Sequence, residues 1–387
     1  MHVAFVTTSQ HGHLNPFVPV MQALRSKGCT VTLLLLVADG DVLSAQRRAA
    51  LGPIDVRVIG EVNIGPWSGP PEGIRRLLET TRIAEQSGAA IRALAPDFVL
   101  IDSMQLTWPA LVGAHASGVP YGLTTANLGM IAPRRFREHR WAYDEITREY
   151  LLRNDIRWSE EAHTPRSPRM NLAPAIHELV GDDAVLDGVT LVGLPGAAAV
   201  RGDETPFPDW QRLDPSRPLI YVSFGTIFHR RPELLRQVIA ATSGLGVQVV
   251  ASVGDLGHAL AGMGDHVILA PYVPQREMLE RASVFVTHGG YNSVAESIRA
   301  GKPMLVIPLA IDQPVQAHYV ERAGFGVSLR PEDATTPAVG AALEMLLDPG
   351  RGYRSRVQAV VGACGDSART IAEMVVETIQ GGTHAAH

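Results

Sequence analysis

Short apolar runs alternate with stretches of helical periodicity along most of the chain. The runs are rich in Val, Ile and Leu and are bounded by glycine or polar residues, which is typical of buried strands in parallel sheets. They cover residues 3–7, 29–36, 98–101, 219–223, 247–252, 267–270, 284–287, 304–307 and 326–329. This pattern predicts an α/β protein with two parallel-sheet domains, each with its own core.

A polar, proline-containing stretch separates the two alternations. We therefore expect a first domain over residues 1–200, a linker over 201–217 and a second domain over 218–365. A helix over 366–380 could pack back on the first domain. The tail 381–387 is short, small and polar, so it is predicted to be disordered.

A glycine turn joins a predicted strand to a predicted helix in the second half. Residues 283–287 form the strand, and the helix over 291–300 ends at Gly301, where Pro303 prevents its continuation. The helix N-terminus offers free N–H groups and a positive dipole end, which favour an anion such as a diphosphate. Donors and glycines at this end are His288, Gly289, Gly290, Asn292 and Ser293. The alternative is an ordinary glycine-rich turn with a surface histidine.

Acidic and amide residues follow this turn at positions suited to hydroxyl groups. Glu296 lies one helical turn beyond Asn292, where a carboxylate can accept from ribose hydroxyls. Asp312 and Gln313 come after the strand at 304–308 and offer acceptors and donors to a sugar. A solvated helical carboxylate at Glu296, and a capping pair for a helix beginning near Pro314, are the alternatives.

Together with Tyr272-Val273-Pro274-Gln275, these residues resemble the signature box of family-1 glycosyltransferases, which glycosylate small natural products. The resemblance implies the GT-B fold, in which two Rossmann-like domains face a crevice. The turn at 223–226 resembles another donor-side loop, although a plain turn is the alternative. The donor-binding residues that the resemblance implies are Thr226, Tyr272, Val273, Gln275, His288, Gly290, Asn292, Ser293, Glu296, Asp312 and Gln313. The plant form of the box opens with Trp, so stacking by Tyr272 would use a smaller aromatic face.

A histidine-containing loop follows the first predicted strand. Asn15 is the predicted N-cap of a helix that starts at Pro16 and ends near Gly28. No G-x-G-x-x-G is present, so a nicotinamide-dependent oxidoreductase is not supported. In the family, a Gly-His-x-x-Pro motif supplies the general base. Its match here favours His13 over His11.

A histidine base needs a partner that fixes its tautomer. The family places an aspartate at the end of a later strand, and Asp102 stands directly after residues 98–101. The catalytic pair is therefore expected to be His13 and Asp102. A satisfied loop histidine and a turn-capping aspartate are the alternatives.

Two segments of the first half are expected to shape the acceptor pocket, residues 63–71 and 127–158. Acceptor-binding candidates within them are Trp67, Asn127, Phe136 and Trp141. The basic run at 133–141 could receive an anionic acceptor or touch a membrane surface. A solvated helix face is the alternative.

The composition limits the remaining classes of function. The chain has 387 residues, 46% of them hydrophobic, which is enough for two cores, and its net charge of −5 argues against nucleic-acid binding. Cys29 and Cys364 are the only cysteines, so no disulfide framework is implied and a cytoplasmic protein fits. No apolar run approaches the length of a membrane span, so no stable membrane insertion is expected. We expect a monomer or homodimer.

The resemblance implies an inverting, metal-independent transfer of a hexose from a nucleotide-sugar donor to a small-molecule acceptor, and no cofactor is expected. Glu296 favours a uridine donor, because relatives that use thymidine-diphospho-deoxysugars often lack this residue and their nucleotide lacks the ribose 2′-hydroxyl. An antibiotic glycosyltransferase that uses such a thymidine donor is one alternative. A nucleotide-sugar epimerase, a cell-wall N-acetylglucosaminyltransferase and a catalytically silent nucleotide-binding auxiliary protein are others.

Overall fold

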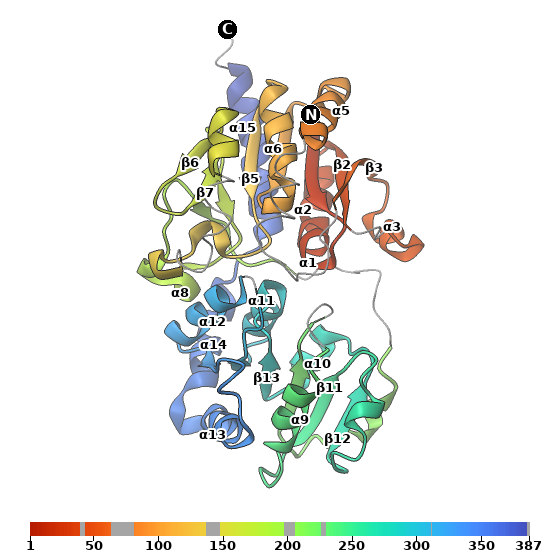
Figure 1. The fold of residues 1–387 in the computed structure, drawn as a ribbon, viewed down its shortest axis with the longest axis vertical. Coiled ribbons are helices and arrows are strands. Elements are labelled where there is room, and N and C mark those ends of the chain that lie inside the picture. Colours follow the sequence, from red (N-terminus) through yellow and green to blue (C-terminus); the bar gives the residue numbers. More distant parts are fainter. Residues whose placement is uncertain are drawn as a thin grey trace. The chain divides into compact units, whose positions relative to one another are not determined.

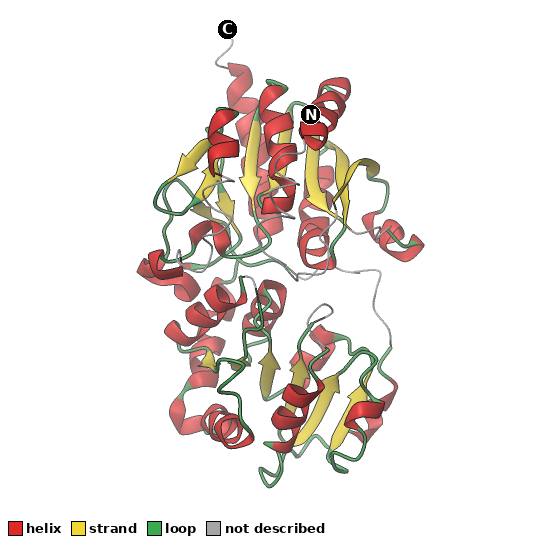
Figure 2. Cartoon of the chain, viewed as in Figure 1, coloured by secondary structure: helices red, strands yellow, loops and turns green. Residues whose placement is uncertain are grey.

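The structure is a computed structural model that describes residues 1–38, 43–62, 81–136, 148–196, 206–225, 230–310 and 312–384. The chain forms two compact units (Figure 1). Unit 1 comprises Met1–Ile176, Asp182–Asp203 and Gly365–His387, and unit 2 comprises His177–Gly181 and Glu204–Cys364. Each unit contains strands and helices in alternation (Figure 2). The domain boundaries named above remain a prediction.

Unit 1 is built on a five-stranded parallel sheet in the order β3-β2-β1-β4-β5. Its strands are β1 (His2–Thr8), β2 (Thr30–Ala38), β3 (Asp55–Val62), β4 (Phe98–Asp102) and β5 (Tyr121–Thr124). Val6 of β1 stands opposite Ile101 of β4, and both side chains are fully buried. The central strands are therefore covered on both faces, which explains their nearly continuous apolar sequence.

The C-terminal helix belongs to the core of unit 1. Helix α15 (Ser367–His384) packs against α2 (Val18–Ser26), and the two lie side by side in Figure 1. Residues Ala368, Ile371 and Val375 of α15 join the same apolar cluster as Phe5 and Met21. Unit 1 therefore takes its core from both ends of the sequence.

Shorter elements complete unit 1. Helices α5 (Thr81–Leu94) and α6 (Trp108–Ala116) pack on each other. The remaining helices and strands are α1 (His11–Leu14), α3 (Ala45–Leu51), β6 (Arg157–Ser159), β7 (Thr164–Arg166), β8 (Leu172–Ala173) and β9 (Thr190–Leu191).

Unit 2 contains a six-stranded parallel sheet in the order β12-β11-β10-β13-β14-β15. The strands are β10 (Leu219–Ser223), β11 (Gln248–Ser252), β12 (Val267–Ala270), β13 (Val284–Thr287), β14 (Met304–Val306) and β15 (Gly326–Ser328). The helices are α8 (His177–Val180), α9 (Pro232–Ala240), α10 (Gln275–Arg281), α11 (Tyr291–Arg299), α12 (Gln313–Arg322), α13 (Thr336–Leu347) and α14 (Tyr353–Val360). All nine predicted strands are present in the two units.

The prediction that Asn15 caps the first helix is wrong. Helical backbone already begins at His11, and a 3₁₀ turn over Asn15–Phe17 connects α1 to α2. Leu14, Phe17 and Met21 are all buried, so the apolar stripe of the helix extends to the N-terminal side of Pro16. The predicted end is correct, since Gly28 follows α2 with a positive φ of 81°.

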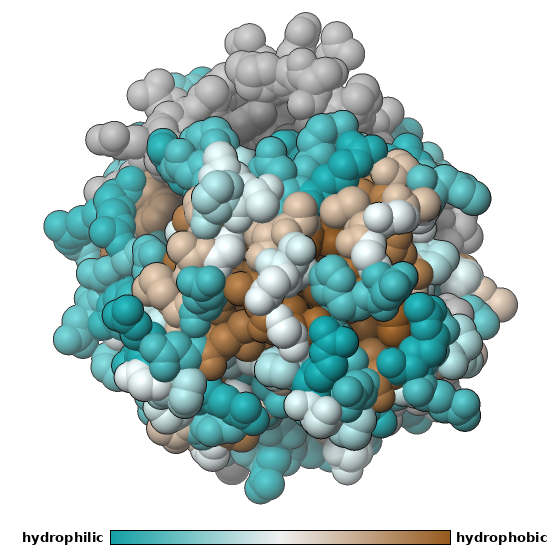
Figure 3. All heavy atoms as spheres, turned by 90° about the horizontal axis from the view of Figure 1, so that it is seen from below, coloured by the Kyte–Doolittle hydropathy of each residue, from teal (hydrophilic) through white to brown (hydrophobic). Residues whose placement is uncertain are grey.

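Polar and apolar residues are mixed on the face of the molecule that Figure 3 draws. Figure 3 shows one face, where polar residues surround and interrupt a central area of apolar ones. Large exposed apolar side chains among the described residues are Met1, Val58, Leu152, Leu186 and Val361. Within the described ranges, no helix combines the length and the apolar character that crossing a bilayer requires.

Candidate functional site

Each sheet has one position where its strand order reverses. The order reverses between β1 and β4 in unit 1 and between β10 and β13 in unit 2. In open α/β sheets, ligands bind beyond the carboxyl ends of the strands at such a switch point. The loops that follow these strands carry the predicted catalytic pair in unit 1 and the predicted anion site in unit 2.

His13 and Asp102 are in hydrogen-bond contact at the switch point of unit 1. His13 Nδ1 lies 2.8 Å from Asp102 Oδ2. The Asp102 side chain is fully buried, whereas that of His13 retains 18% exposure. A carboxylate on Nδ1 fixes the imidazole tautomer and leaves Nε2 to act on a ligand. The arrangement can therefore accept a proton at Nε2.

Thr7 also binds this pair, and the sequence reasoning missed it. Its Oγ1 donates to Asp102 Oδ2 at 2.9 Å. Thr107 Oγ1 donates to the Asp102 carbonyl oxygen at 2.5 Å, which fixes the backbone of the same residue. Thr7 follows Val6, which pairs with Ile101, so the register of β1 and β4 places Thr7 beside Asp102. Thr7 can be identified as a partner of Asp102 once the register of β1 and β4 is known.

Several buried polar atoms at this end of the sheet lack a hydrogen-bond partner within the described ranges. They are Asp102 Oδ1, Thr8 Oγ1, Thr124 Oγ1 and Trp108 Nε1. Thr124 stands opposite Asp102 in the sheet, and Trp108 begins the helix that follows β4. Buried polar groups normally have partners, so this end of the sheet is unusual among the described residues.

His288 occupies the corresponding place in unit 2, directly after β13. It is 8% exposed, and burial lowers its pKa to about 4, against a smaller opposing effect from a backbone hydrogen bond with Ser223. The ring is therefore neutral at neutral pH. A Cβ on Gly290 would lie 2.6 Å from His288 Nε2, and one on Gly225 would lie 2.8 Å from Cε1. Both glycines are thus needed to make room for the imidazole.

Helix α11 begins beside this histidine. Gly290 is its N-cap and provides no side-chain capping bond, so the first-turn N–H groups have no side-chain acceptor at the cap. Asn292 is half-buried and Ser293 is buried on this first turn. This helix end therefore has the features that favour an anion, with a neutral imidazole beside it.

Glu296 is held in place by α10. Gln275 Nε2 donates to Glu296 Oε2 at 2.7 Å, and Arg276 Nε lies 3.6 Å from Oε1. The Glu296 side chain is only 13% exposed. It is therefore not a freely solvated helical carboxylate. Gln275 and Glu296 were predicted separately as donor-binding residues, and the structure brings them into contact.

The Gln313 side chain forms hydrogen bonds with the backbone of the loop that follows β14. Gln313 Oε1 accepts from the N–H groups of Leu309 at 2.7 Å and Ala310 at 2.9 Å. A sugar contact by this buried side chain would have to come from its amide nitrogen. Asp312 precedes α12 without a side-chain capping bond, and Gln316 donates to its carboxylate.

The other candidates differ in their surroundings. Tyr272 is half-buried, whereas the Val273 side chain is 2% exposed and belongs to the interior, so Val273 can offer a ligand only its backbone. Asn127 Oδ1 accepts from Gly129 N at 2.7 Å and so shapes its own turn. Arg135 lies over the half-buried Phe136 ring. Thr226, Trp67 and Trp141 lie outside the described residues.

The described ranges contain no group of three or more His, Cys, Asp or Glu side chains placed to hold a metal ion. Cys29 and Cys364 are both buried free thiols. Each unit therefore carries its own group of candidate residues: a His–Asp pair in unit 1, and a helix N-terminus with polar neighbours in unit 2.

Two doubly wound parallel-sheet units of this kind define the GT-B fold, and comparison with solved structures supports this. A structure of the glycotransferase of kitacinnamycin superposes with a TM-score of 0.77 at 22% identity, covering 98% of this chain and 99% of that one. The glycosyltransferase VinC in complex with DTDP gives a TM-score of 0.70 at 20% identity, covering 98% of this chain and all of that one (100%).

Sequence comparison shows the same similarity. Residues 196–360 match the family model described as UDP-glucoronosyl and UDP-glucosyl transferase. The oleandomycin glycosyltransferase of Streptomyces antibioticus is 29% identical over 95% of this chain and 89% of its own length. The chain is therefore similar to family-1 glycosyltransferases, in agreement with the resemblance noted in the sequence.

Proposed function

We propose that this enzyme transfers a hexose, with inversion, from a uridine-diphospho-sugar to a hydroxyl of a small natural product. The observation that carries the proposal is the 2.8 Å contact between His13 Nδ1 and the buried Asp102 carboxylate. The relative from Streptomyces antibioticus, which is named for oleandomycin, supports a natural-product acceptor.

His13 acts as the general base in this mechanism. Its Nε2 takes the proton of the acceptor hydroxyl while Asp102 stabilises the imidazolium that forms. The acceptor oxygen then forms a bond to the anomeric carbon from the face opposite the nucleotide. The bond from that carbon to the diphosphate oxygen breaks, and the diphosphate departs with the electron pair.

Unit 2 stabilises the leaving diphosphate in this proposal. The first-turn N–H groups of α11 and the hydroxyl of Ser293 donate to its oxygens. His288 acts as a neutral hydrogen-bond donor, because burial lowers its pKa to about 4. These groups take over the charge stabilisation that a divalent metal provides elsewhere, so activity should persist in excess EDTA.

Glu296 supports the uridine donor. Gln275 positions its carboxylate, which can then accept from ribose hydroxyls. The family description also names UDP-sugar transferases. A thymidine-diphospho-deoxysugar is the second candidate donor, because VinC has the same fold and was solved in complex with DTDP.

Product analysis tests the proposal directly. Purified enzyme is incubated with a labelled uridine-diphospho-hexose or its thymidine counterpart and a panel of polyketide and aromatic acceptors. A glycosylated product of inverted anomeric configuration is expected, with higher kcat/KM for the uridine donor. Retention of configuration would contradict the mechanism. Equal kcat/KM values would remove the donor preference.

A further inference from the structure

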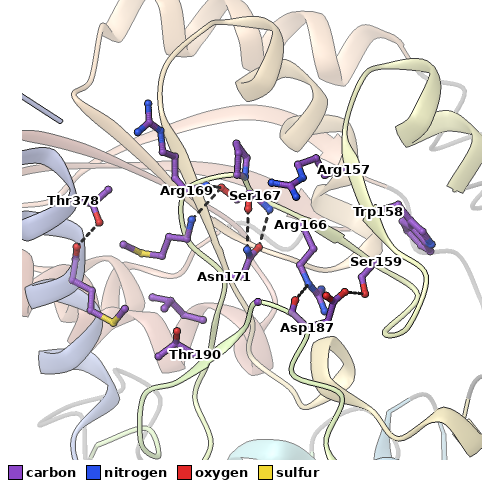
Figure 4. Close-up of a pocket in the computed structure, with 15 residues that line it drawn as sticks. Arg157, Trp158, Ser159, Arg166, Ser167, Arg169, Asn171, Asp187, Thr190 and Thr378 are labelled. Atoms are coloured by element: carbon purple, nitrogen blue, oxygen red, sulfur yellow. Dashed lines mark hydrogen bonds between the residues drawn. The ribbon is translucent and has the colours of Figure 1, made fainter. Parts of the chain in front are cut away.

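A cavity of about 450 Å³ in unit 1 belongs to neither group of site residues described above (Figure 4). Its walls come from the β6–β7 hairpin, residues 167–172, residues 187–190 and α15. All of these segments are part of unit 1.

The cavity lies along a different part of β5 from the His13–Asp102 pair. Ser167 Oγ, in the cavity wall, donates to the carbonyl oxygen of Tyr121 at 2.6 Å, and Tyr121 is the first residue of β5. Asp102 stands opposite Thr124, the last residue of the same strand. At about 3.3 Å per residue, the two places are roughly 10 Å apart along β5. The cavity is therefore a separate site.

The lining is cationic although the whole chain is acidic. Arg157, Arg166 and Arg169 line the cavity, and Asp187 is its one acidic lining residue. The Asp187 carboxylate accepts from Ser159 Oγ. Three positive groups against one negative group make this region attractive to anions.

Arg166 forms a fixed part of the wall. It is buried, and its Nε donates to the Asp187 carbonyl oxygen at 2.9 Å while Nη1 donates to Thr164 Oγ1 at 2.5 Å. Burial lowers its pKa to about 10, so the group stays charged at neutral pH. Arg166 therefore contributes positive charge to the wall, but its guanidinium is held by these hydrogen bonds and does not move to meet a bound molecule.

Arg157 and Arg169 are the available cations. Both are exposed, and neither forms an ion pair with any residue in the described ranges. Arg169 sits on a loop closed by Ser167 and Asn171, whose backbone and amide groups bond reciprocally at 2.7 and 2.9 Å. Figure 4 shows this closed loop beside Arg169. The loop backbone that carries Arg169 is thus already ordered, which reduces the entropy cost of binding.

Apolar side chains form another part of the wall, which also contains serine, threonine and asparagine side chains. The apolar lining residues are Trp158, Met170, Leu172 and Met374. We propose that this cavity is a second binding site, which takes a small molecule with an oxyanion group joined to an apolar body. Arg157 and Arg169 bind the oxyanion, and the apolar wall receives the body.

The test is calorimetry on the full chain in excess uridine diphosphate, so that diphosphate sites are filled. The probe is 4-phenylbenzoate, with uncharged 4-phenylbenzamide and inorganic phosphate as matched controls. We expect the benzoate to bind at least tenfold more tightly than either control. The double variant Arg157→Gln/Arg169→Gln should weaken benzoate binding by about 10–100-fold, since two charge-assisted hydrogen bonds are lost.

A charge-matched variant separates this site from a general effect of charge. Arg48→Gln removes an exposed arginine of α3 that does not line the cavity, and it should leave benzoate binding unchanged. His13→Ala should also retain it, which distinguishes this proposal from the proposed catalytic role. No benzoate binding by the wild-type chain, equal binding of the benzamide, or equal affinity in the double variant would each overturn the proposal.

The oxyanion could belong to the acceptor or to a separate metabolite, and inhibition kinetics distinguish the two. Benzoate inhibition that excess acceptor relieves assigns the anion to the acceptor. An effect on turnover that excess acceptor does not relieve assigns the site to a separate ligand.

Discussion

His13 and His288 occupy comparable places in the two units, since each follows a strand at the switch point of its sheet. Their surroundings differ. His13 is partly exposed and contacts a buried carboxylate, whereas His288 is buried between two glycines with a pKa of about 4. A carboxylate partner suits a histidine to proton transfer, and burial without one keeps it neutral. The same topology thus supports a proton acceptor in one unit and a neutral donor in the other.

The largest effect is expected from removing His13, the proposed general base in unit 1. His13→Ala is expected to lower kcat by about 10²–10⁴-fold, because the general base is lost, while affinity for the nucleoside diphosphate stays unchanged. Single-turnover rates and calorimetry measure the two quantities. His11→Ala is the control and should retain most turnover. If His11→Ala gave the larger loss, the base would be His11.

The pH dependence of stability tests the neutrality of His288. Its folded pKa of about 4 lies below the ordinary 6.5, so between these values the unfolded chain binds more protons. The free energy of unfolding should therefore fall as pH is lowered from 6.5 to 4. The contribution of this residue is about 3 kcal/mol at most. Denaturant unfolding of wild type and His288→Gln measures it, and the variant should show the shallower fall. Parallel curves would mean that His288 titrates normally.

Diphosphate affinity tests the role of His288 as a donor. His288→Ala should weaken the intact donor and free nucleoside diphosphate alike by about tenfold, because one hydrogen bond to a charged group is lost. Calorimetry at neutral pH is the measurement. His258→Ala changes an exposed histidine of the same unit and should have no effect. Unchanged diphosphate affinity in His288→Ala would contradict the assignment.

Glu296 tests the proposed preference for uridine donors over thymidine donors. Glu296→Ala should reduce the preference for uridine over thymidine donors by about tenfold, because the acceptor for ribose hydroxyls is lost. The ratio of kcat/KM values for the paired donors measures this. Glu277→Ala removes an exposed carboxylate of α10 and serves as the control. A preference that survives Glu296→Ala would make Glu296 an ordinary helix carboxylate.

The smallest expected effect concerns Thr7. Thr7→Val removes the 2.9 Å hydrogen bond to Asp102 and should lower kcat by about three- to tenfold. The pH–rate profile should also shift, because Asp102 orients the base. Thr7→Ser keeps the hydroxyl and should restore both values. An unchanged profile in Thr7→Val would limit Thr7 to a packing role.

The candidates of unit 2 are recognised by local spacing, whereas one contact of unit 1 depends on the order of strands in the sheet. The glycine turn, Ser293 and Glu296 lie close together in the chain, so local spacing is enough to recognise them. Thr7 and Asp102 meet only because β1 and β4 are neighbours in the sheet, and the sequence pattern does not show that order.

The other differences between the sequence-based predictions and the structure come from packing and from contacts between distant segments. Strand β3 is mostly exposed and β5 has only four residues, so neither produced a clear apolar run. The wrong N-cap at Asn15 arose because Pro16 suggested a helix start, although burial of Leu14 favoured an earlier one. The fit of Gly225 around His288 depends on segments distant in sequence. The internal bonds of Gln313 are local, but they depend on the conformation of the loop, which the sequence pattern does not show.

The position of α15 has a consequence for synthesis of the protein. Its residues Ile371, Ala372 and Val375 are part of the apolar cluster formed by the first strands of the chain. A ribosome makes those strands before unit 2 and this helix after it. Unit 1 therefore cannot complete its core until the described strands of unit 2 have all been made. Although the amino-terminal unit is begun first, it should be the second of the two to reach its final packing.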